Sequence, residues 1–377
     1  MPTAHPREDR MSNGVTRLAS AALMPLADAV ACLTSGVSPV AEDGRPIHAA
    51  LGFTAARDVI AERDWPEATT ALRDGWAVAA DDVIGASAYA PILLTAPPVW
   101  VEAGEALPDG ACTVLPPEAL EGRAFVADAP PGDGARRRGE DLKAGACLLA
   151  AGTRIVPRHL LTLGAAGRDA VPVRVPRIGL VATGRASLVA ALLSALIAAD
   201  GAASTEVMAA GDDPDALAAA IRAVRADAVF VLGGTGPGRT DHSVAALARA
   251  GAVAAHGIAL RPGETAAIGR ADGCPVLLLP GRPEAALAVY LALGRPLVSA
   301  LTGARPPEPA TATLLRKVTA TIGVSDVVFV RRAAEGIEPL GGVDLALSRL
   351  AEADGAILVE PEREGYPEGA TCEVLPL

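Results

Sequence analysis

Hydrophobic and polar positions follow two periods between Arg177 and Leu279. Short apolar runs such as "IGLVA" and "VLLL" alternate with longer segments of helical period such as "LVAALLSALIAA". Short runs of this kind are typical of buried strands, and the longer segments are typical of amphipathic or buried helices. Regular strand–helix alternation predicts a parallel α/β sheet whose connections are right-handed crossovers.

The pattern changes on both sides of this region. Between Ala90 and Pro131, short alternating runs such as "VWVEAG" and "CTVL" are broken by proline and glycine, which predicts a small all-β insert. After the linker "ARPPEP", the tail from Thr311 is again β-patterned, with "GAILVEP" and "ATCEVLPL" as strands. The fold class that follows is a multidomain α/β and β protein.

The N-terminal half predicts more local elements. Helical periodicity begins near Leu18, and a strand is expected over Arg45–Gly52. The stretch "GEDLKAGACLLAAGTRI" is interpreted as a glycine-turned hairpin, and "VPRHLLTLGAAG" as a helix ended by glycine. The apolar run Leu188–Ala199 is shorter than the roughly 20 residues that span a bilayer, so we expect a buried helix.

At 377 residues the chain is too long for one ordinary hydrophobic core, so several domains are expected. The predicted units are a disordered tail (1–16), an elongated mixed α/β domain (17–50 and 140–172), a β-rich insert (51–139), a parallel α/β domain (173–304) and a C-terminal β domain (305–377).

Composition narrows the possible partners. A hydrophobic content of 51% with 20% charged residues indicates a folded globular protein. The net charge of -11 argues against nucleic acid and membrane surfaces as partners, although arginines could still receive a small anion. The five cysteines are scattered without a CxxC pair, which favours reduced thiols in a cytoplasmic protein over a zinc site or disulfides.

Candidate chemistry gathers where three predicted strands of the α/β domain end. Ligands bind beyond the carboxyl ends of parallel strands, and the loops "ATGRAS", "GGTGPGRTD" and "PGRPEA" all leave such ends. Glycines there allow backbone N–H groups to approach a phosphate. "GGTGPGRTD" matches neither common phosphate-loop pattern, so a glycine-rich turn that only ends a strand is an equally good interpretation. Asp241 could hold a divalent cation or could cap the helix that follows, and the residues alone favour the cap.

Two further motifs lie in the N-terminal half. In "RRRGEDL" (Arg136–Leu142), three arginines precede two carboxylates, a mixture that would suit a magnesium-bound phosphate anhydride but is also typical of a solvated loop. In "RDGWAV", Asp74 precedes a glycine, which also fits an Asx turn.

The order of these motifs resembles the molybdopterin molybdenumtransferase family, which includes the E domain of gephyrin. The resemblance runs through "LRDGWAV", "GEALPDGACTVLPPE", "RRRGEDLKAGACLLAAGTRI", "VLGGTGPGRTD", "LLPGRP" and "ALSRLAEADGAILVEPE", from about Leu18 to Leu377. It implies four domains, with the parallel α/β domain as the molybdopterin-binding domain, and an elongated homodimer whose site lies at the subunit interface.

The resemblance also implies the activity, which is insertion of molybdate into adenylylated molybdopterin with release of AMP and with Mg²⁺ as cofactor. Asp74, Asp141 and Asp241 would be the catalytic residues, and Asp141 and Asp241 the metal ligands. The residues implied to bind substrate are Arg136, Arg137, Arg138, Thr183, Gly184, Gly233, Gly234, Thr235, Gly238, Pro280, Gly281, Arg282 and Pro283.

The chain is a divergent member by this comparison. Where the family has Asp-Glu-Leu after "ATG", this chain has Arg185, Ala186 and Ser187, and the following asparagine-bearing motif is absent. Arg282 replaces the asparagine of the family's "LPGNP". Three readings therefore stand side by side: a divergent transferase, a catalytically impaired paralogue that binds a pterin, nucleotide or protein as a homodimer, and an enzyme for an altered anionic substrate.

Overall fold

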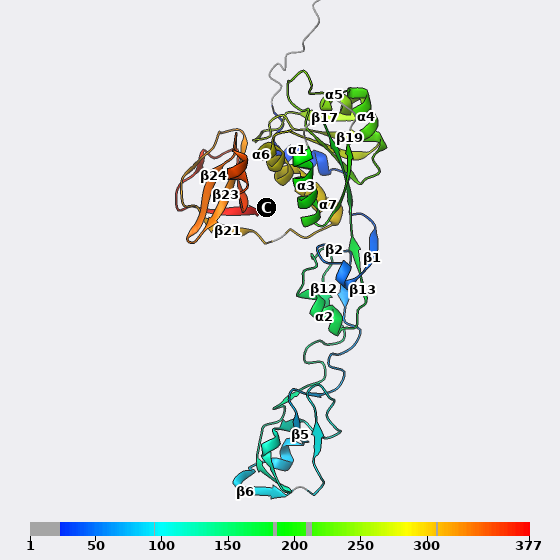
Figure 1. The fold of residues 1–377 in the computed structure, drawn as a ribbon, viewed down its shortest axis with the longest axis vertical. Coiled ribbons are helices and arrows are strands. Elements are labelled where there is room, and N and C mark those ends of the chain that lie inside the picture. Colours follow the sequence, from blue (N-terminus) through cyan, green and yellow to red (C-terminus); the bar gives the residue numbers. More distant parts are fainter. Residues whose placement is uncertain (1–22, 94, 184–186, 209–212, 307) are drawn as a thin grey trace, which may run out of the picture.

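The computed structural model describes residues 23–93, 95–183, 187–208, 213–306 and 308–377. The molecule is elongated (Figure 1). An α/β unit carries a C-terminal β unit at its side, and a narrow stem leads away from it to a small β unit at the far end. Residues 70–136 build the small β unit at one end, and the α/β and C-terminal units lie at the other end.

The α/β unit is built on a six-stranded sheet in the order β15-β14-β16-β20-β19-β17. The strands are β14 (Arg177–Ala182), β15 (Ala203–Met208), β16 (Ala228–Leu232), β17 (Ala252–His256), β19 (Ala267–Ala271) and β20 (Cys274–Leu279). The first four strands in the sheet order are parallel, and β19 pairs antiparallel both with β20 and with the edge strand β17, so β19 is the strand of this sheet that runs in the opposite direction. The predicted parallel sheet is therefore correct for its strand–helix part and gains an antiparallel edge.

Helices cover both faces of this sheet, because successive strand residues are apolar and point to opposite sides. On β16, Phe230 and Leu232 belong to one core, while Val229 and Val231 belong to the other. The first core also takes residues of α1 (Leu26–Thr34), α3 (Ser187–Ala199), α6 (Pro283–Val289), a π-helical segment (Tyr290–Gly294) and α7 (Arg295–Thr302). The second takes residues of α4 (Pro214–Ala223) and α5 (Ser243–Ala250).

One helical stretch of the described chain, Pro283–Thr302, is long and apolar enough to cross a membrane by composition. It is 78% buried within the fold, so it serves as the central core helix of the α/β unit. The run Leu188–Ala199 lies in α3, with Val189, Leu193 and Ile197 buried against the sheet and Leu188 exposed.

The C-terminal β unit shares a sheet with the α/β unit. Its strands are β21 (Ala310–Thr313), β22 (Val318–Thr319), β23 (Ser325–Ala333), β24 (Gly336–Gly341), β25 (Gly355–Val359), β26 (Gly365–Tyr366) and β27 (Thr371–Pro376), with α8 at Leu347–Leu350. The main sheet begins with β18 (Leu260–Arg261), a strand of the α/β unit that pairs in parallel with β23.

An ion pair reinforces this junction. The guanidinium of Arg261 donates Nε–H to Asp326 Oδ1 at 2.7 Å and Nη2–H to Oδ2 at 3.2 Å, and the Asp326 side chain is only 6% exposed. Thr321 also donates its backbone N–H to Asp326, at 2.8 Å. The carboxylate is thus fully engaged where the two units meet.

The stem consists of short antiparallel pairs. It contains β1 (Glu42–Pro46), β2 (Thr54–Ala55), β3 (Val59–Ile60), β12 (Cys147–Leu149), β13 (Ala170–Arg174), a 3₁₀ turn (Ile47–Ala49) and α2 (His159–Ala165). β13 lies between β1 and β2, and β12 pairs with β3. Segments from both sides of the insert therefore build the stem together.

The small β unit holds the strands β4 (Thr70–Ala71), β5 (Gly75–Val78), β6 (Ser87–Leu93), β7 (Val99–Val101), β8 (Thr113–Leu115), β9 (Leu120–Glu121), β10 (Ala124–Ala127) and β11 (Ala135–Arg136), with 3₁₀ turns at Ala80–Val83 and Pro117–Ala119. They form two three-stranded sheets, β7-β5-β8 and β6-β10-β9, and the pair β11-β4.

The multidomain α/β and β fold class is confirmed, but two local predictions are wrong. The strand expected over Arg45–Gly52 is instead β1, which ends at Pro46 and is followed by the 3₁₀ turn. The expected hairpin does not form, because β12 pairs with β3 far upstream rather than with its own neighbour. The tail 1–16 and Leu18 lie outside the described residues, and the domain boundaries stay predictions.

Candidate functional site

Three loops meet where β14, β16 and β20 end. Thr183, the first residue after β14, donates both its N–H (3.0 Å) and its hydroxyl (2.9 Å) to the carbonyl of Leu232 at the end of β16. Gly233 in turn donates its N–H to Leu279 O at the end of β20, at 2.9 Å. A Cβ built on Gly281 would lie 3.5 Å from Gly233 Cα. The predicted residues of these loops are therefore neighbours; Gly184 lies outside the described residues.

Glycine is required at the start of the middle loop. Gly233 and Gly234 both have positive φ, at 88° and 67°. A Cβ on Gly234 would stand 2.7 Å from Ser243 Oγ, whose hydroxyl donates to Gly233 O at 2.6 Å. Ser243 is fully buried and opens α5, so it holds the loop against the helix N-terminus.

Asp241 has a different local role from the predicted helix cap. Its Oδ2 accepts the N–H of Gly238 at 2.9 Å, and its own N–H donates to Gly238 O at 3.1 Å. The helix begins at Ser243, and its N-cap residue is His242, whose side chain makes no cap. The expectation of a cap is wrong because the carboxylate turns back into its own loop.

The loop's backbone amides divide into two groups. Those of Gly233 and Gly238 are bonded within the protein, so two of the three glycines predicted to cradle a phosphate donate elsewhere. The N–H groups of Gly234, Thr235 and Gly236 have no acceptor among the described residues. Consecutive free backbone donors beside a helix N-terminus are the kind of group that binds phosphate.

Thr235 is fixed beneath this loop. Its side chain is 3% exposed, and its hydroxyl lies 2.9 Å from the hydroxyl of Thr265. His256 Nε2 lies 3.1 Å from Thr235 O. These contacts orient the Thr235 backbone, while its buried hydroxyl faces Thr265 rather than the exposed part of the loop.

The third loop carries Arg282. Pro280 at the start of the loop is buried, and Pro283 after Arg282 is the first residue of α6. Arg282 ion-pairs with Asp344 of the C-terminal unit and lies 3.5 Å from Glu284, measured from Nε to Oε1. The Glu284 side chain is only 5% exposed. The carboxylates of Asp344 and Glu284 therefore hold the Arg282 guanidinium at this edge of the sheet.

The "RRRGEDL" motif lies at the junction of the stem and the small β unit. Arg136 Nη1 lies 3.1 Å from Asp141 Oδ2, and Arg138 Nε lies 2.8 Å from Asp64 Oδ2. The N–H of Arg137 donates to Glu140 Oε2 at 2.8 Å. Two of the three predicted anion-binding arginines are therefore neutralised within the chain, and Arg137 is the one without an ion pair among the described residues.

Asp64 anchors this turn. The N–H of Ala144 and the guanidinium of Arg138 both bind its carboxylate, and together they lower the pKa of Asp64 below its usual value. The backbone of Asp141 is held beside this turn as well, because its N–H donates to Trp65 O at 3.1 Å.

Asp74 lies on the small β unit, directly before β5. Its Oδ1 accepts the N–H of Ala103 at 2.8 Å. The next residue, Gly104, donates to Ala71 O in β4, and β4 pairs with β11, where Thr70 faces Arg136. This ladder places Asp74 in the same part of the molecule as the Arg136–Asp141 pair.

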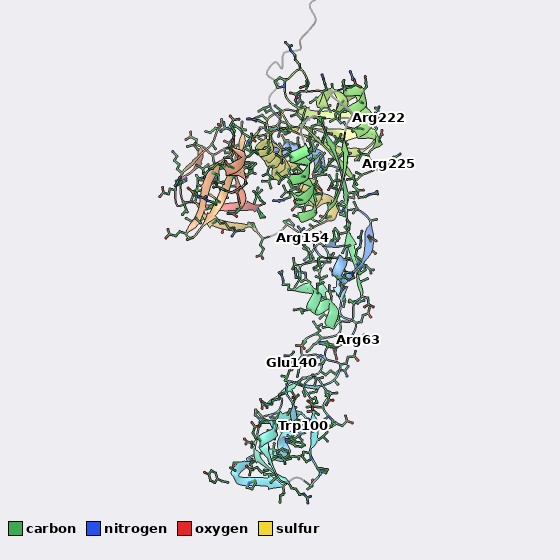
Figure 2. All side chains as sticks on the ribbon, viewed as in Figure 1. Arg63, Trp100, Glu140, Arg154, Arg222 and Arg225 are labelled. Carbon is green, nitrogen blue, oxygen red and sulfur yellow. The ribbon has the colours of Figure 1, made fainter. Side chains whose placement is uncertain are left out.

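One chain does not bring the three predicted catalytic aspartates together. In Figure 1, β5, which follows Asp74, lies at the opposite end of the molecule from α5, which follows Asp241. Figure 2 likewise places Glu140, the neighbour of Asp141, and Trp100 far from Arg222 and Arg225 of the α/β unit. Among the described residues there is no group of three or more His, Cys, Asp or Glu side chains able to hold a metal. The predicted metal ligands, Asp141 and Asp241, thus form no magnesium site within a single chain.

The structure also adds residues that the sequence did not single out. Ser243 and Asp344 contact the predicted site residues directly, and neither belongs to a recognisable local motif. The glycine at 234 was the available signal for Ser243, since a close approach of another group is one reason for glycine.

Comparison with known proteins connects these observations. Three family models match in order: the MoeA N-terminal region (domain I and II) at residues 24–167, a probable molybdopterin binding domain at 181–300, and the MoeA C-terminal region (domain IV) at 311–377.

Similar whole proteins carry related names. Molybdopterin molybdenumtransferase 1 of Mycobacterium tuberculosis is 28% identical over 90% of this chain and 96% of its own length. Molybdopterin molybdenumtransferase of Bacillus subtilis is 25% identical over 85% of this chain and 86% of its own length. A crystal structure of the molybdopterin biosynthesis MoeA protein from Pyrococcus horikoshii superimposes with a TM-score of 0.75 at 26% identity, covering 94% of this chain and 99% of that one.

Proposed function

This chain belongs to the MoeA family, and we propose that it is a molybdopterin molybdenumtransferase that acts in molybdenum cofactor biosynthesis. In the proposed reaction, molybdate is inserted into adenylylated molybdopterin and AMP is released. Molybdate and the adenylylated pterin are the substrates, and we place the reaction in the cytoplasm.

The observation that carries the proposal is the set of amides after β16. Gly234, Thr235 and Gly236 carry consecutive N–H groups that have no acceptor among the described residues, close in sequence to the N-terminus of α5. A phosphate group bound there would be held by backbone donors and the helix dipole, so no lysine is needed. Arg239 and Arg282 add positive charge at the edges of the same loops.

The amides would bind and orient the phosphate of the substrate, whereas the reaction also needs carboxylates. We propose that the site is completed in a homodimer, where the small β unit of one subunit brings Asp74 and Asp141 to the strand-end loops of another. Mg²⁺ would then be held between Asp141 of one copy and Asp241 of the other, since magnesium prefers carboxylate oxygens and substrate phosphates. A single chain cannot hold the ion, because these two residues lie in separate units.

The reaction itself can be tested directly. Purified protein is mixed with adenylylated molybdopterin, molybdate and magnesium, and AMP is measured by chromatography. The proposal expects AMP release that depends on molybdate and is lost on chelation of the metal. The absence of release at high protein concentration, with ligand binding intact, would favour the alternative of a binding protein.

A second experiment tests the composite site. The variants Asp74→Asn and Asp241→Asn are each expected to be inactive alone, because each removes a carboxylate from every site of a homodimer. Co-expressed in one cell, the two variants should recover part of the activity. A heterodimer of the two contains one site in which neither aspartate is changed. No recovery in verified heterodimers would place all the required residues within one subunit.

Ala186 stands where the family has a glutamate, which is the feature that favours the impaired paralogue. The names of the similar proteins favour the transferase over the impaired paralogue. The retained Asp74, Asp141 and Asp241 are consistent with this preference.

A further inference from the structure

The chain is poor in aromatic residues, yet two of its three tryptophans form a pair on the small β unit. Aromatic residues make up 3% of the sequence. Trp76 on β5 and Trp100 on β7 face each other across the two strands, with ring centroids 5.0 Å apart and planes at 80°. An edge-to-face pair of this kind is a preferred geometry and holds both rings in fixed orientation.

The pair is exposed rather than buried. Trp100 is 39% exposed, and Trp76 is half-buried at the edge of a small core formed by residues such as Val78 and Phe125. Large exposed apolar side chains in a cluster indicate a contact surface more often than isolated ones do.

Both indole N–H groups are already bonded to the protein. Trp100 Nε1 donates to Glu102 Oε1 at 2.9 Å, and Trp76 Nε1 donates to Pro117 O at 3.3 Å. The pair therefore offers ring carbon surface to a partner, with its polar atoms turned to internal acceptors. An indole ring whose N–H group is already bonded suits stacking better than hydrogen bonding.

The position of the pair connects it to the candidate catalytic residues. Trp76 comes two residues after Asp74, and Glu102 precedes Ala103, whose N–H binds the Asp74 carboxylate. The Asp74 carboxylate and the Trp100 indole therefore contact the same loop, through Ala103 and Glu102. Acidic groups beside an aromatic platform do not suit a free anion, but they suit a planar ring whose phosphate is held elsewhere.

We propose that the Trp100 indole, held edge-to-face by Trp76, is a stacking platform for a planar heteroaromatic ring of the substrate, with Trp100 as the positioning residue. The inference rests on the proposed function, since the ring would belong to a molecule whose phosphate occupies the strand-end loops of a second subunit. Adenylylated molybdopterin carries two such rings, a pterin and an adenine, and the platform's chemistry suits either.

Kinetics of two substitutions at Trp100 test the platform. Trp100→Ala removes the stacking surface and should raise KM for adenylylated molybdopterin about tenfold, with kcat within about threefold of the unchanged protein. Trp100→Phe retains an aromatic face and should restore KM to within about threefold. Tyr89→Ala is the matched control, because Tyr89 is fully exposed on the same unit and should leave both constants unchanged.

Calorimetric titration with AMP alone and with a free pterin alone identifies the ring. The ligand whose affinity falls in Trp100→Ala and recovers in Trp100→Phe is the one that stacks. Unchanged affinity for both ligands, together with unchanged KM, would overturn the platform while AMP release by the unchanged protein still upheld the transferase. If the unchanged protein releases no AMP, the titrations still decide whether a ring binds at Trp100.

Sedimentation of the same variants tests whether the tryptophan pair packs against a second copy of the chain instead of a ring of the substrate. The proposal expects Trp100→Ala to keep the oligomeric state of the unchanged protein. Dissociation by Trp100→Ala without a change in ring affinity would show that the pair packs against a second copy of the chain and would overturn the proposal.

Discussion

Arg282 of the α/β unit forms an ion pair with Asp344 of the C-terminal β unit. The pair spans the boundary between two units at the edge of the strand-end loops, and Glu284 approaches the same guanidinium. Arg282 is therefore an anion-binding candidate whose charge is partly compensated before any ligand arrives.

We predict that Asp344→Asn strengthens substrate binding. The Arg282 and Asp344 side chains are 56% and 76% exposed, so losing their pair should change the free energy of unfolding by only about 0–1 kcal/mol. The freed positive charge should lower KM about two- to fivefold at low ionic strength, and salt should abolish the difference because exposed charges are screened. Steady-state kinetics at low and high salt measure this, with Asp43→Asn in the stem as control. A higher KM would mean that Asp344 orients Arg282 for binding.

Asp241→Asn separates the shape of the glycine loop from its charge. An amide oxygen can still accept the N–H of Gly238, so the loop should persist and the Kd for substrate should stay within about threefold. Because the proposed Mg²⁺ site uses this carboxylate, kcat should fall by about 10²-fold or more. Asp241→Ala should weaken binding as well, because the turn loses its acceptor. Full activity in Asp241→Asn would limit Asp241 to shaping the loop.

Pro237→Val should raise the affinity for molybdopterin. Pro237 is exposed between Gly236 and Gly238 and contributes no N–H. Valine would add a fourth donor after those of Gly234, Thr235 and Gly236. Titration of the pterin into both proteins measures the effect, with Pro97→Val on the small β unit as control. Equal or weaker binding would count against a phosphate cradle in this loop.

The stability of the folded protein should depend on pH through Asp64 under acidic conditions. The N–H of Ala144 and the guanidinium of Arg138 lower the pKa of Asp64 in the folded protein below its ordinary value of 3.8. The carboxylate therefore stabilises the fold at pH above 3.8, and this contribution is lost as the pH falls through the folded pKa. The Tm difference between the unchanged protein and Asp64→Asn should be constant near neutral pH and should shrink below pH 3.8. A difference independent of pH throughout that range would contradict the assignment.

Arg261→Met should destabilise the junction between the α/β and C-terminal units. It leaves the nearly buried Asp326 carboxylate with only the Thr321 N–H, and removing one partner of a buried pair costs about 3 kcal/mol. Chemical denaturation measures the loss, and Arg45→Met, at an exposed pair in the stem, should cost below about 1 kcal/mol. Similar costs at both positions would show that the junction does not depend on this pair.

The sequence predicted best those elements whose own residues carry the pattern. β16 is buried on both faces, so its continuous apolar run identified it. β1 reads "EDGRP", is mostly exposed and has no apolar alternation, and it forms because β13 offers it backbone partners. The pairing of β12 with β3 is equally long-range, which is why a local hairpin was the wrong interpretation.

The site shows the same division. Glycines with positive φ and the strand ends could be recognised from the sequence, and the structure makes Thr183, Gly233 and Gly281 neighbours. The acceptor role of Asp241 could not be distinguished from a helix cap, since both place an aspartate just before a helix. The partners of Arg282 and Arg138 depend on residues remote in the chain, Asp344 and Asp64, which no local motif reveals.

The parallel pairing of β18 with β23 has a consequence for how the chain matures. Synthesis proceeds from the N-terminus, so Leu260 and Arg261 leave the ribosome before Ser325 and Asp326. The earlier segment can thus serve as a template on which the last sheet assembles. Expressed by itself, the segment after Thr311 would lack that template and leave the Ser325–Asp326 end of β23 unpaired, where another chain could add a strand.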